Sequence, residues 1–497
     1  MFALSKSSIV SLCQQSLGDL PTGVVRPLFD RSSLSPGIVH IGVGNFHRAH
    51  QSWYLQQLMQ QGDALDWAII GAGVKSYDLN QRQKLIKQDC LTTLIELDPS
   101  GSRVEVVGSM IDYLPIDDTN SALIKYLARP EIRIVSLTVT EGGYFLNSGT
   151  NCFDESHPDI VYDAKFPDTP KTAFGAIVAA LKMRWEAGHG PITGLSCDNL
   201  QGNGDALRSA VLGLANLSNP KLANWIESNC TFPNSMVDCI VPRTGSTEIK
   251  LSQEFGINDR VPVTHENFRQ WVIEDNFCVG RPNLEDVGVT FASEIKNYEQ
   301  MKIRILNGGH QVIAGCGEML SIETISGCME NRNIDTLLSK IILEEIAPHV
   351  QPVPNMDPTS YFHEIKLRFS NSKILDTTRR VSSNGSTYHP GFIFPSIWDG
   401  LRSGAPIEGL ALVEAIWARM AEGTREDGSE IEPKDANWET LQKCAILAKT
   451  DPMAWLNMRD IYAELSDQPR FSKAFIKWFL LIWSDGIEAS ISAFIET

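Results

Sequence analysis

Short apolar runs of strand length alternate with helix-length segments through the first 290 residues. A run from Ile38 to Ile41 is followed by others in DWAIIGAGV, VEVVGSM, IRIVSLTVT and PITGLSCDNL. Segments with helical length and pattern, 121–127 and 172–187, lie between the later runs. This alternation is typical of βαβ units, in which a helix returns the chain so that successive strands are parallel. The sequence therefore predicts an α/β fold built on a parallel sheet.

The pattern changes near residue 298. Beyond it, apolar residues recur at a spacing near 3.6 and few strand-like runs remain. The segment GRPNLEDVG, just before the change, contains residues that break regular structure. We expect two domains, 1–290 with the parallel sheet and 291–497 mostly α-helical. Within the second, the charged segment GTREDGSEIEPKDAN (423–437) is predicted to be a solvated loop.

The composition excludes several classes of protein. Of 497 residues, 43% are hydrophobic and 21% charged, so the chain can bury a large core. A formal net charge of −17 opposes binding to nucleic acid or anionic lipid. No apolar run approaches the roughly 18 residues that span a bilayer, and no basic signal-peptide region opens the chain, which favours a cytoplasmic protein without a membrane partner. The ten cysteines form no CxxC pair and no Cys/His cluster, so we expect no metal site.

The first strand leads into a Gly-x-Gly turn and then a helical pattern. Gly42 and Gly44 would let backbone amides approach the pyrophosphate of a dinucleotide. His47 stands where the third glycine of the dinucleotide fingerprint would be, so the turn alone also fits an ordinary strand-to-helix connection. After the second strand, Asp78 could bind the ribose hydroxyls of NAD, whereas Lys75 could meet the 2′-phosphate of NADP. The sequence leaves NADP open, and we favour NAD.

The segment MKIRILNGGHQ carries three polar side chains that could do chemistry. On an α-helix advancing about 100° per residue, Lys302, His310 and Asn307 lie near about 0°, 80° and 140°, within one broad face. A desolvated lysine can act as a base, and an asparagine amide can donate to a developing oxyanion. The same pattern also fits a surface lysine, a helix breaker and a core histidine.

Six motifs occur together in an order seen in one enzyme family: HIGVGNFHRAHQ, TVTEGGY, SCDN, SMVD, QWVIEDNF and KIRILNGGH. In these motifs, from about residue 38 to at least residue 395, the chain resembles the polyol-specific long-chain dehydrogenases. The resemblance implies a Rossmann-type N-terminal domain, a mostly helical C-terminal domain, an active site between them and no metal.

The resemblance also implies roles for individual residues. Lys302 matches the family's general base, and His310 matches the residue that orients the substrate. Asn199 and Asn307 match the pair that binds and polarises the substrate oxygen. Residues that line the polyol site or the proton path are matched by Glu141, Asp238, Glu299 and Arg380. The cofactor loop would contain Gly42, Gly44 and Phe46, with Asp78 as a ribose contact.

The expected reaction is metal-independent and interconverts a sugar alcohol and its ketose, mannitol and fructose, with NAD. D-arabinitol and fructuronate, on which other members of the family act, are the alternatives because the motifs are shared. Two further classes are a nucleotide-binding regulatory protein with an idle cleft, and an epimerase or lyase that retains its cofactor. The resemblance to enzymes that are often monomeric favours a monomer.

Overall fold

The computed structural model describes residues 9–147 and 152–497. The chain divides after Ile295 into two compact units, which we call the N-terminal unit and the C-terminal unit. The sequence predicts the division a few residues earlier, after residue 290.

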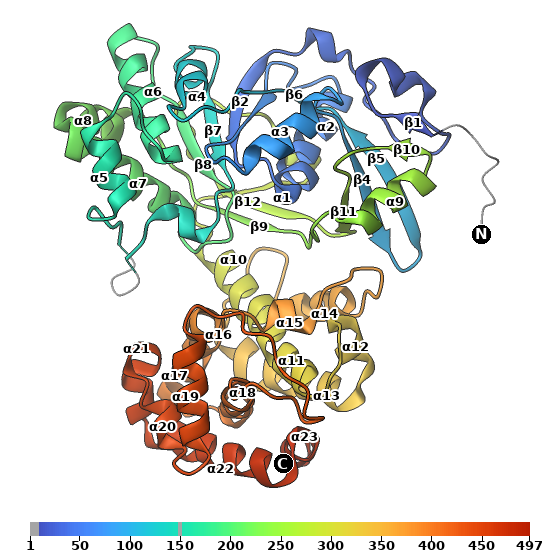
Figure 1. Ribbon diagram of the computed structural model, residues 1–497, viewed down its shortest axis with the longest axis vertical. Coiled ribbons are helices and arrows are strands. Elements are labelled where there is room, and N and C mark those ends of the chain that lie inside the picture. The colour runs from blue at the N-terminus through green and yellow to red at the C-terminus, as the bar shows by residue number, and fades with distance from the viewer. Residues whose placement is uncertain (1–8, 148–151) are drawn as a thin grey trace. The chain divides into compact units, whose positions relative to one another are not determined.

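The N-terminal unit contains a five-stranded parallel sheet with the strand order β6-β3-β2-β7-β8 (Figure 1). In chain order its strands are β2 (Pro36–Ile41), β3 (Ala68–Ala72), β6 (Met110–Tyr113), β7 (Ile134–Leu137) and β8 (Thr193–Ser196). Ile38 of β2 pairs with Ile69 of β3 on one side and with Ile134 of β7 on the other. The order of winding therefore reverses between β2 and β7. In open α/β sheets, such a switch point marks the crevice in which ligands bind.

Side chains of the sheet enter two separate cores, because successive residues of a strand point to opposite faces. Val39 and Val135 belong to one core, whose helices are α4 (Ser121–Leu127), α6 (Ala173–Ala187), α7 (Asn203–Ser218) and α8 (Pro220–Asn229). Ile38 and Ile134 belong to the other, with α2 (Gln51–Gln60) and the strand β12 (Gln270–Glu274). Each buried aliphatic side chain of this size contributes about 1.5–3 kcal/mol. The two cores fix the strand ends at which the candidate residues lie.

One predicted strand belongs to a different sheet. The apolar residues of VEVVGSM end β5 (Gly101–Val107), which pairs antiparallel with β4 (Thr92–Asp98), and only Met110 enters the parallel sheet. A connection as short as Pro99-Ser100 allows a hairpin but not the long crossover that parallel strands need. The strand β11 (Val263–Glu266) completes this sheet. In a third sheet β12 is the central strand, between β9 (Ser235–Asp238) and β13 (Thr290–Ala292). A fourth pairs β1 (Val10–Ser11) with β10 (Ile257–Asn258).

Shorter helices complete the N-terminal unit. The remaining α-helices are α1 (Asn45–Ala49), α3 (Asp78–Ile86), α5 (Pro158–Lys165) and α9 (Ser246–Glu254). The 3-10 helices are η1 (Gln14–Asp19), η2 (Arg31–Ser33), η3 (Glu141–Tyr144) and η4 (Leu284–Val287).

The C-terminal unit is helical, as the sequence predicted, and residues 296–497 contain no strand. Its core surrounds α18 (Glu408–Met420), which is buried from Gly409 onward and packs on α11 (Gly308–Met319) and α22 (Pro469–Asp485). The first helices are α10 (Lys296–Met301), α12 (Ile325–Glu330), α13 (Arg332–Ile341), α14 (Pro358–Phe369), α15 (Thr378–Val381), α16 (Gly385–Tyr388) and α17 (Phe394–Ser403). The last are α19 (Trp438–Ala448), α20 (Met453–Leu456), α21 (Arg459–Tyr462) and α23 (Ile487–Ile495), and η7 (Ala347–His349) and η9 (Ala463–Asp467) are 3-10 turns.

Three π-helices interrupt the α-helices of the C-terminal unit: η5 (Lys302–Asn307), η6 (Ile342–Ile346) and η8 (His389–Ile393). The first contacts both of the others. A π-helix is a costly, rare arrangement that recurs at functional sites. Here η5 coincides with the segment that the sequence singled out for chemistry.

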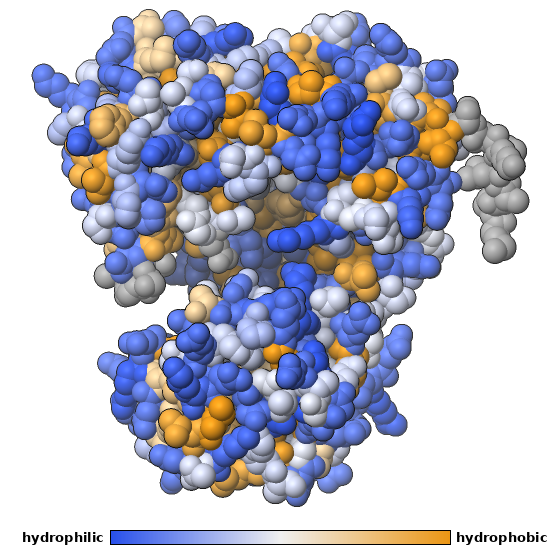
Figure 2. Space-filling view, viewed as in Figure 1, coloured by the Kyte–Doolittle hydropathy of each residue, from blue (hydrophilic) through white to orange (hydrophobic). Residues whose placement is uncertain are grey.

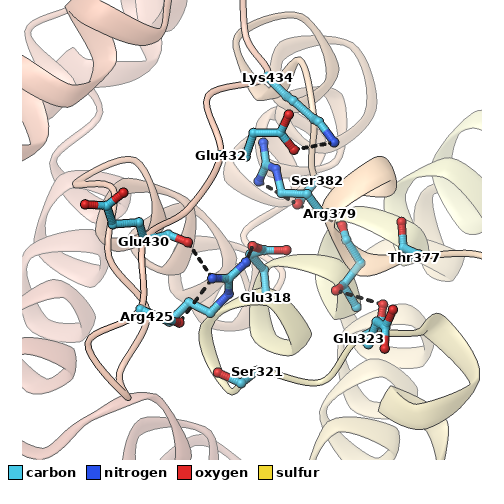
Figure 3. Close-up of polar contacts among 12 residues, drawn as sticks. Glu318, Ser321, Glu323, Thr377, Arg379, Ser382, Arg425, Glu430, Glu432 and Lys434 are labelled. Atoms are coloured by element: carbon cyan, nitrogen blue, oxygen red, sulfur yellow. Dashed lines mark hydrogen bonds and ion pairs between the residues drawn. The ribbon is translucent and has the colours of Figure 1, made fainter.

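The charged segment 423–437 is only partly the solvated loop that the sequence predicts (Figure 3). Arg425 donates to Oε1 of the buried Glu318, near the end of α11, at 2.6 Å. Ile431 is 3% exposed and belongs to the core. Glu432 and Lys434, by contrast, form an ion pair in which both side chains are exposed. Arg425 and Ile431 therefore fix part of the segment to the helical core.

The visible surface of each unit is mostly hydrophilic, with apolar side chains scattered over it (Figure 2). Among the described residues, no helix combines the length and the hydropathy that crossing a membrane would require.

Candidate active site

The Gly-x-Gly turn follows β2 at the switch point of the sheet. Gly42 has a φ of +95°, and a Cβ there would lie 2.3 Å from the carbonyl oxygen of Thr138, so the turn admits only glycine. A Cβ on Gly44 would meet nothing nearer than the Gly42 oxygen at 3.9 Å. Phe46, in α1, is half-buried and stacks on His50 at 4.7 Å. The turn thus leaves open space beside the backbone of Gly44, where a ligand could approach.

Two buried histidines lie next to this turn: His40, which sequence reasoning missed, and His47, to which it gave no role. His40 and His47 stack with ring centroids 3.5 Å apart. The ring nitrogens of His40 hydrogen-bond Ser136 Oγ at 2.8 Å and Thr138 Oγ1 at 3.0 Å. Thr138 in turn donates to the Gly42 carbonyl at 2.6 Å. His47, at the place of the third glycine of the fingerprint, therefore has a packing role. The signal that could have revealed His40 was a histidine inside an apolar strand.

We expect the protein to lose stability in acid because of these two histidines and a third buried one, His265 of β11. Burial lowers the pKa of His40 and of His265 to about 3, and that of His47 well below its usual value. Below about pH 6.5 the unfolded chain protonates these rings while the folded chain does not, so the free energy of unfolding falls as the pH falls from about 6.5 towards 3. His40 alone accounts for about 2 kcal/mol at about pH 5. Urea unfolding at about pH 7.5 and pH 5 measures the difference, and equal free energies at the two pH values would refute it.

Asp78 lies where the sequence predicts, at the start of α3 after β3. Its Oδ2 accepts hydrogen bonds from the backbone amides of Val74 and Lys75, both at 3.1 Å. Burial raises the pKa of this carboxyl above its usual value. Because β2 and β3 are parallel neighbours, Asp78 and the Gly42 turn meet at the same edge of the sheet.

Polar residues also follow β7, β8 and β9. Asn199 is exposed and comes directly after Asp198, beyond the end of β8. Asp238 ends β9 and is 5% exposed. Glu141 begins η3 after β7, and its side chain lies outside the described part of the structure. Sequence reasoning overlooked Asp198, although it stands in the SCDN motif beside the residue that was chosen.

The segment of Lys302 and Asn307 is not the α-helix that the sequence predicts. It is the π-helix η5, and only Gly308 onward is α-helical. In a π-helix, hydrogen bonds join residues five apart, so Lys302 and Asn307 lie about one turn apart along the helix. In an α-helix the same two residues would be separated by a wide angle around the axis. Lys302 and Glu299 are each 7% exposed. His310, in the first turn of α11, stacks on Phe369 at 4.2 Å.

Neighbouring elements hold the π-helix η5 in place. Arg304 forms an ion pair with Asp399 of α17. A Cβ on Gly308 would lie 3.4 Å from the carbonyl oxygen of Phe392 in η8. Gly308 therefore lies beside η8, but a Cβ on Gly308 or Gly309 would make only ordinary van der Waals contacts, so close packing does not require glycine at either position.

Arg380 lies on α15, which packs on α11, the helix that carries His310. Its Nε and Nη2 each donate to the carboxylate of Asp376 at 2.6 Å. The Arg380 side chain is nevertheless 65% exposed. A bidentate pair of this kind fixes the direction of the guanidinium and leaves its other N–H groups able to donate to a polyol.

Comparison with known proteins identifies the family. A model of the mannitol dehydrogenase Rossmann domain matches residues 36–286, and a model of the mannitol dehydrogenase C-terminal domain matches residues 294–483. The chain belongs to the mannitol dehydrogenase family. One relative in this family, a mannitol 2-dehydrogenase of Cereibacter sphaeroides, is 50% identical over 95% of this chain and 99% of its own. Another, of Aspergillus terreus, is 38% identical over 95% of each chain.

Solved structures of the family have the same fold. The ternary complex of Pseudomonas fluorescens mannitol 2-dehydrogenase with NAD and D-mannitol aligns with a TM-score of 0.90 at 38% identity, over 98% of this chain and 100% of that one. A D-sorbitol dehydrogenase in substrate-free form aligns with a TM-score of 0.87 at 34% identity, over 97% and 100%. The Rossmann-type N-terminal unit and the helical C-terminal unit that the sequence predicts are confirmed. Within residues 9–147 and 152–497, no three His, Cys, Asp or Glu side chains are grouped as metal ligands.

Proposed function

We propose that this chain is a metal-independent mannitol 2-dehydrogenase that interconverts mannitol and fructose with NAD. The observation that carries the proposal is the 50% identity, over nearly the whole chain, to a protein of that name. The likeness to a complex with NAD and D-mannitol supports the same cofactor and substrate. The chain is expected to act as a monomer, as the resemblance implies.

The cofactor residues in this proposal are Gly42, Gly44, Phe46 and Asp78. The open backbone beside Gly44 suits a pyrophosphate, since nothing but the Gly42 oxygen lies within 4 Å of its Cβ position. Asp78 begins α3, after the neighbouring strand β3, where a carboxylate can accept from ribose hydroxyls and would repel a 2′-phosphate. NAD is therefore favoured over NADP.

The catalytic residues in this proposal are Lys302, Asn199, Asn307 and His310. Lys302, neutral when mannitol binds, accepts the proton of the hydroxyl that is oxidised, and NAD, when bound, accepts the hydride. The amides of Asn199 and Asn307 donate to the oxygen as negative charge develops on it. His310, held flat against Phe369, orients the substrate. The buried position of Lys302 and its place about one π-turn before Asn307 support this assignment.

Four further residues are assigned to the polyol chain or the proton path: Glu141, Asp238, Glu299 and Arg380. Carboxylates accept hydrogen bonds from hydroxyl groups, and a guanidinium donates to them, so this set suits a polyhydroxy substrate. Glu299 precedes Lys302 by one helical turn, which suits a group that passes a proton to or from the lysine.

A substrate panel tests this proposal. Chelator-treated enzyme is given NAD or NADP with mannitol, sorbitol or D-arabinitol, and NADH with fructose or fructuronate. We expect the highest kcat/KM with mannitol and NAD, and with fructose in reverse. Sorbitol is the second candidate because of the 34% identical D-sorbitol dehydrogenase. A higher kcat/KM with sorbitol, D-arabinitol or fructuronate would refute mannitol, and turnover without net release of NADH would indicate an epimerase or a lyase.

Two glycine variants test the cofactor assignment. Gly42→Ala places its Cβ against the Thr138 carbonyl at a positive φ, so we expect a lower unfolding temperature and no NAD binding. Gly44→Ala has room for its Cβ in the free protein, so it should fold normally and yet bind NAD more weakly. Thermal unfolding and calorimetric titration with NAD separate the two effects. Wild-type affinity for NAD in Gly44→Ala would show that the pyrophosphate does not bind beside Gly44.

A further inference from the structure

Asp198 is a buried carboxylate that joins the loops after two neighbouring strands. It is 7% exposed and comes two residues after the end of β8. Its two oxygens accept from the backbone amides of Val139 at 3.1 Å and Thr140 at 2.8 Å, both in the loop after β7. Oδ2 also accepts from the hydroxyl of Tyr144 at 2.8 Å. One carboxylate thus holds the β7 loop against the β8 loop at the carboxyl edge of the sheet.

The β7 loop needs such support because its backbone is strained. Thr140, a β-branched residue, has a φ of +68°, a conformation that costs about 1–3 kcal/mol and persists only where the surroundings impose it. On the other side of the loop, Thr138 donates to the Gly42 carbonyl. The loop is therefore held from both sides, by the glycine turn after β2 and by Asp198 after β8.

The backbone around Asn199 is fixed by the same residue. The Asp198 carbonyl accepts from the Leu200 amide at 2.9 Å and from Asn203 Nδ2 at 3.0 Å. Asn203 in turn donates to the carbonyl of Ser235, the first residue of β9. With its side chain bound to one loop and its carbonyl bound to the start of α7, Asp198 leaves the backbone of Asn199 little freedom.

We propose that Asp198 is a positioning residue, which holds Asn199 at the place from which its amide donates to the substrate oxygen. This inference rests on the proposed function, because it assumes the role assigned to Asn199. The Asp198 carboxylate is the suitable group, because it accepts from the two amides and the hydroxyl at once. An asparagine in its place has one acceptor oxygen and turns its NH₂ group towards an N–H donor.

Asp198→Asn is therefore expected to lower kcat for mannitol about 10²-fold through misplacement of Asn199, with the KM for NAD unchanged. Asp163→Asn is the matched control. Asp163 is also a buried carboxylate, 2% exposed, that accepts from two backbone amides, Lys171 and Thr172, and from the Thr172 hydroxyl. It holds the start of α6 and no loop with an assigned residue, so a similar fall in unfolding temperature with wild-type kcat is expected.

A double-mutant cycle with Asn199→Ala decides whether Asp198 acts through Asn199. If it does, adding Asp198→Asn to Asn199→Ala lowers kcat no further. Multiplied losses in the double variant, or an equal loss of kcat in Asp163→Asn, would overturn the inference. Wild-type enzyme inactive with mannitol would instead contradict the proposed function.

Amide hydrogen exchange tests the clamp without reference to activity. In Asp198→Asn, the amides of Val139 and Thr140 should exchange faster, while those of β2 and β3 keep their protection. Unchanged exchange at Val139 and Thr140 would show that Asp198 does not hold the loop. Faster exchange across the whole sheet would show a general loss of stability, which also overturns the inference.

Discussion

Replacing Lys302 by alanine is expected to lower kcat/KM for mannitol oxidation by about 10²–10⁴-fold, the range that a positioned acid or base contributes. The loss should fall on kcat, with NAD binding intact, because the turn that carries Gly42 and Gly44 belongs to the other unit. Steady-state rates and calorimetric titration with NAD measure the two quantities. Lys296→Ala, which removes an exposed lysine from the preceding helix, is the control and should retain wild-type rates.

The same lysine sets the direction of the pH dependence. Oxidation needs neutral Lys302 to accept a proton, and reduction of fructose needs protonated Lys302 to donate one. The rate of oxidation should therefore rise with pH, and the rate of reduction should rise as the pH falls. Wild-type activity in Lys302→Ala, or the opposite pair of pH profiles, would show that Lys302 is not the acid/base of the reaction.

Asn307→Ala is expected to lower kcat by about 10²–10³-fold, the usual loss for a single donor to a developing oxyanion. The amide interacts most strongly when charge accumulates on the oxygen, so KM should change less than kcat. The position of Asn307 at the end of η5, one π-turn from Lys302, is the structural basis. Asn297→Ala, an exposed asparagine on α10, is the control. An equal change in kcat for both variants would contradict the assignment.

Much of the fold could be predicted from the sequence because burial leaves a periodic signal. The apolar run at residues 38–41 lies within β2, and the run at 132–140 contains β7. The segment 121–127 is a helix with the predicted bounds. The hairpin of β4 and β5 was missed, since an apolar run shows that a strand is buried but not which strand it pairs with. Ile431 was missed for a related reason, because one apolar residue in a charged segment has no period.

The candidate site was harder to predict than the fold. Lys302 and Asn307 were found by residue type and motif, but the π-helix that changes their spacing was not, and it packs against η6 and η8, which lie far along the chain. Asp198 is held by contacts with the loop after β7, Thr140 among them, and His40 by Ser136 of β7. Local sequence carries no record of such partners. In the sequence, Asp198 and His40 are recognisable as polar residues in or just after a buried strand.

The most direct test of the central claim is a product balance in the presence of chelator. Purified enzyme is incubated with EDTA, NAD and mannitol, NADH is measured by absorbance, and the sugar product is identified by chromatography. We predict one NADH and one fructose for each mannitol consumed, at the same rate with and without EDTA. No NADH, a product other than fructose, or activity that EDTA abolishes would contradict a metal-independent mannitol 2-dehydrogenase.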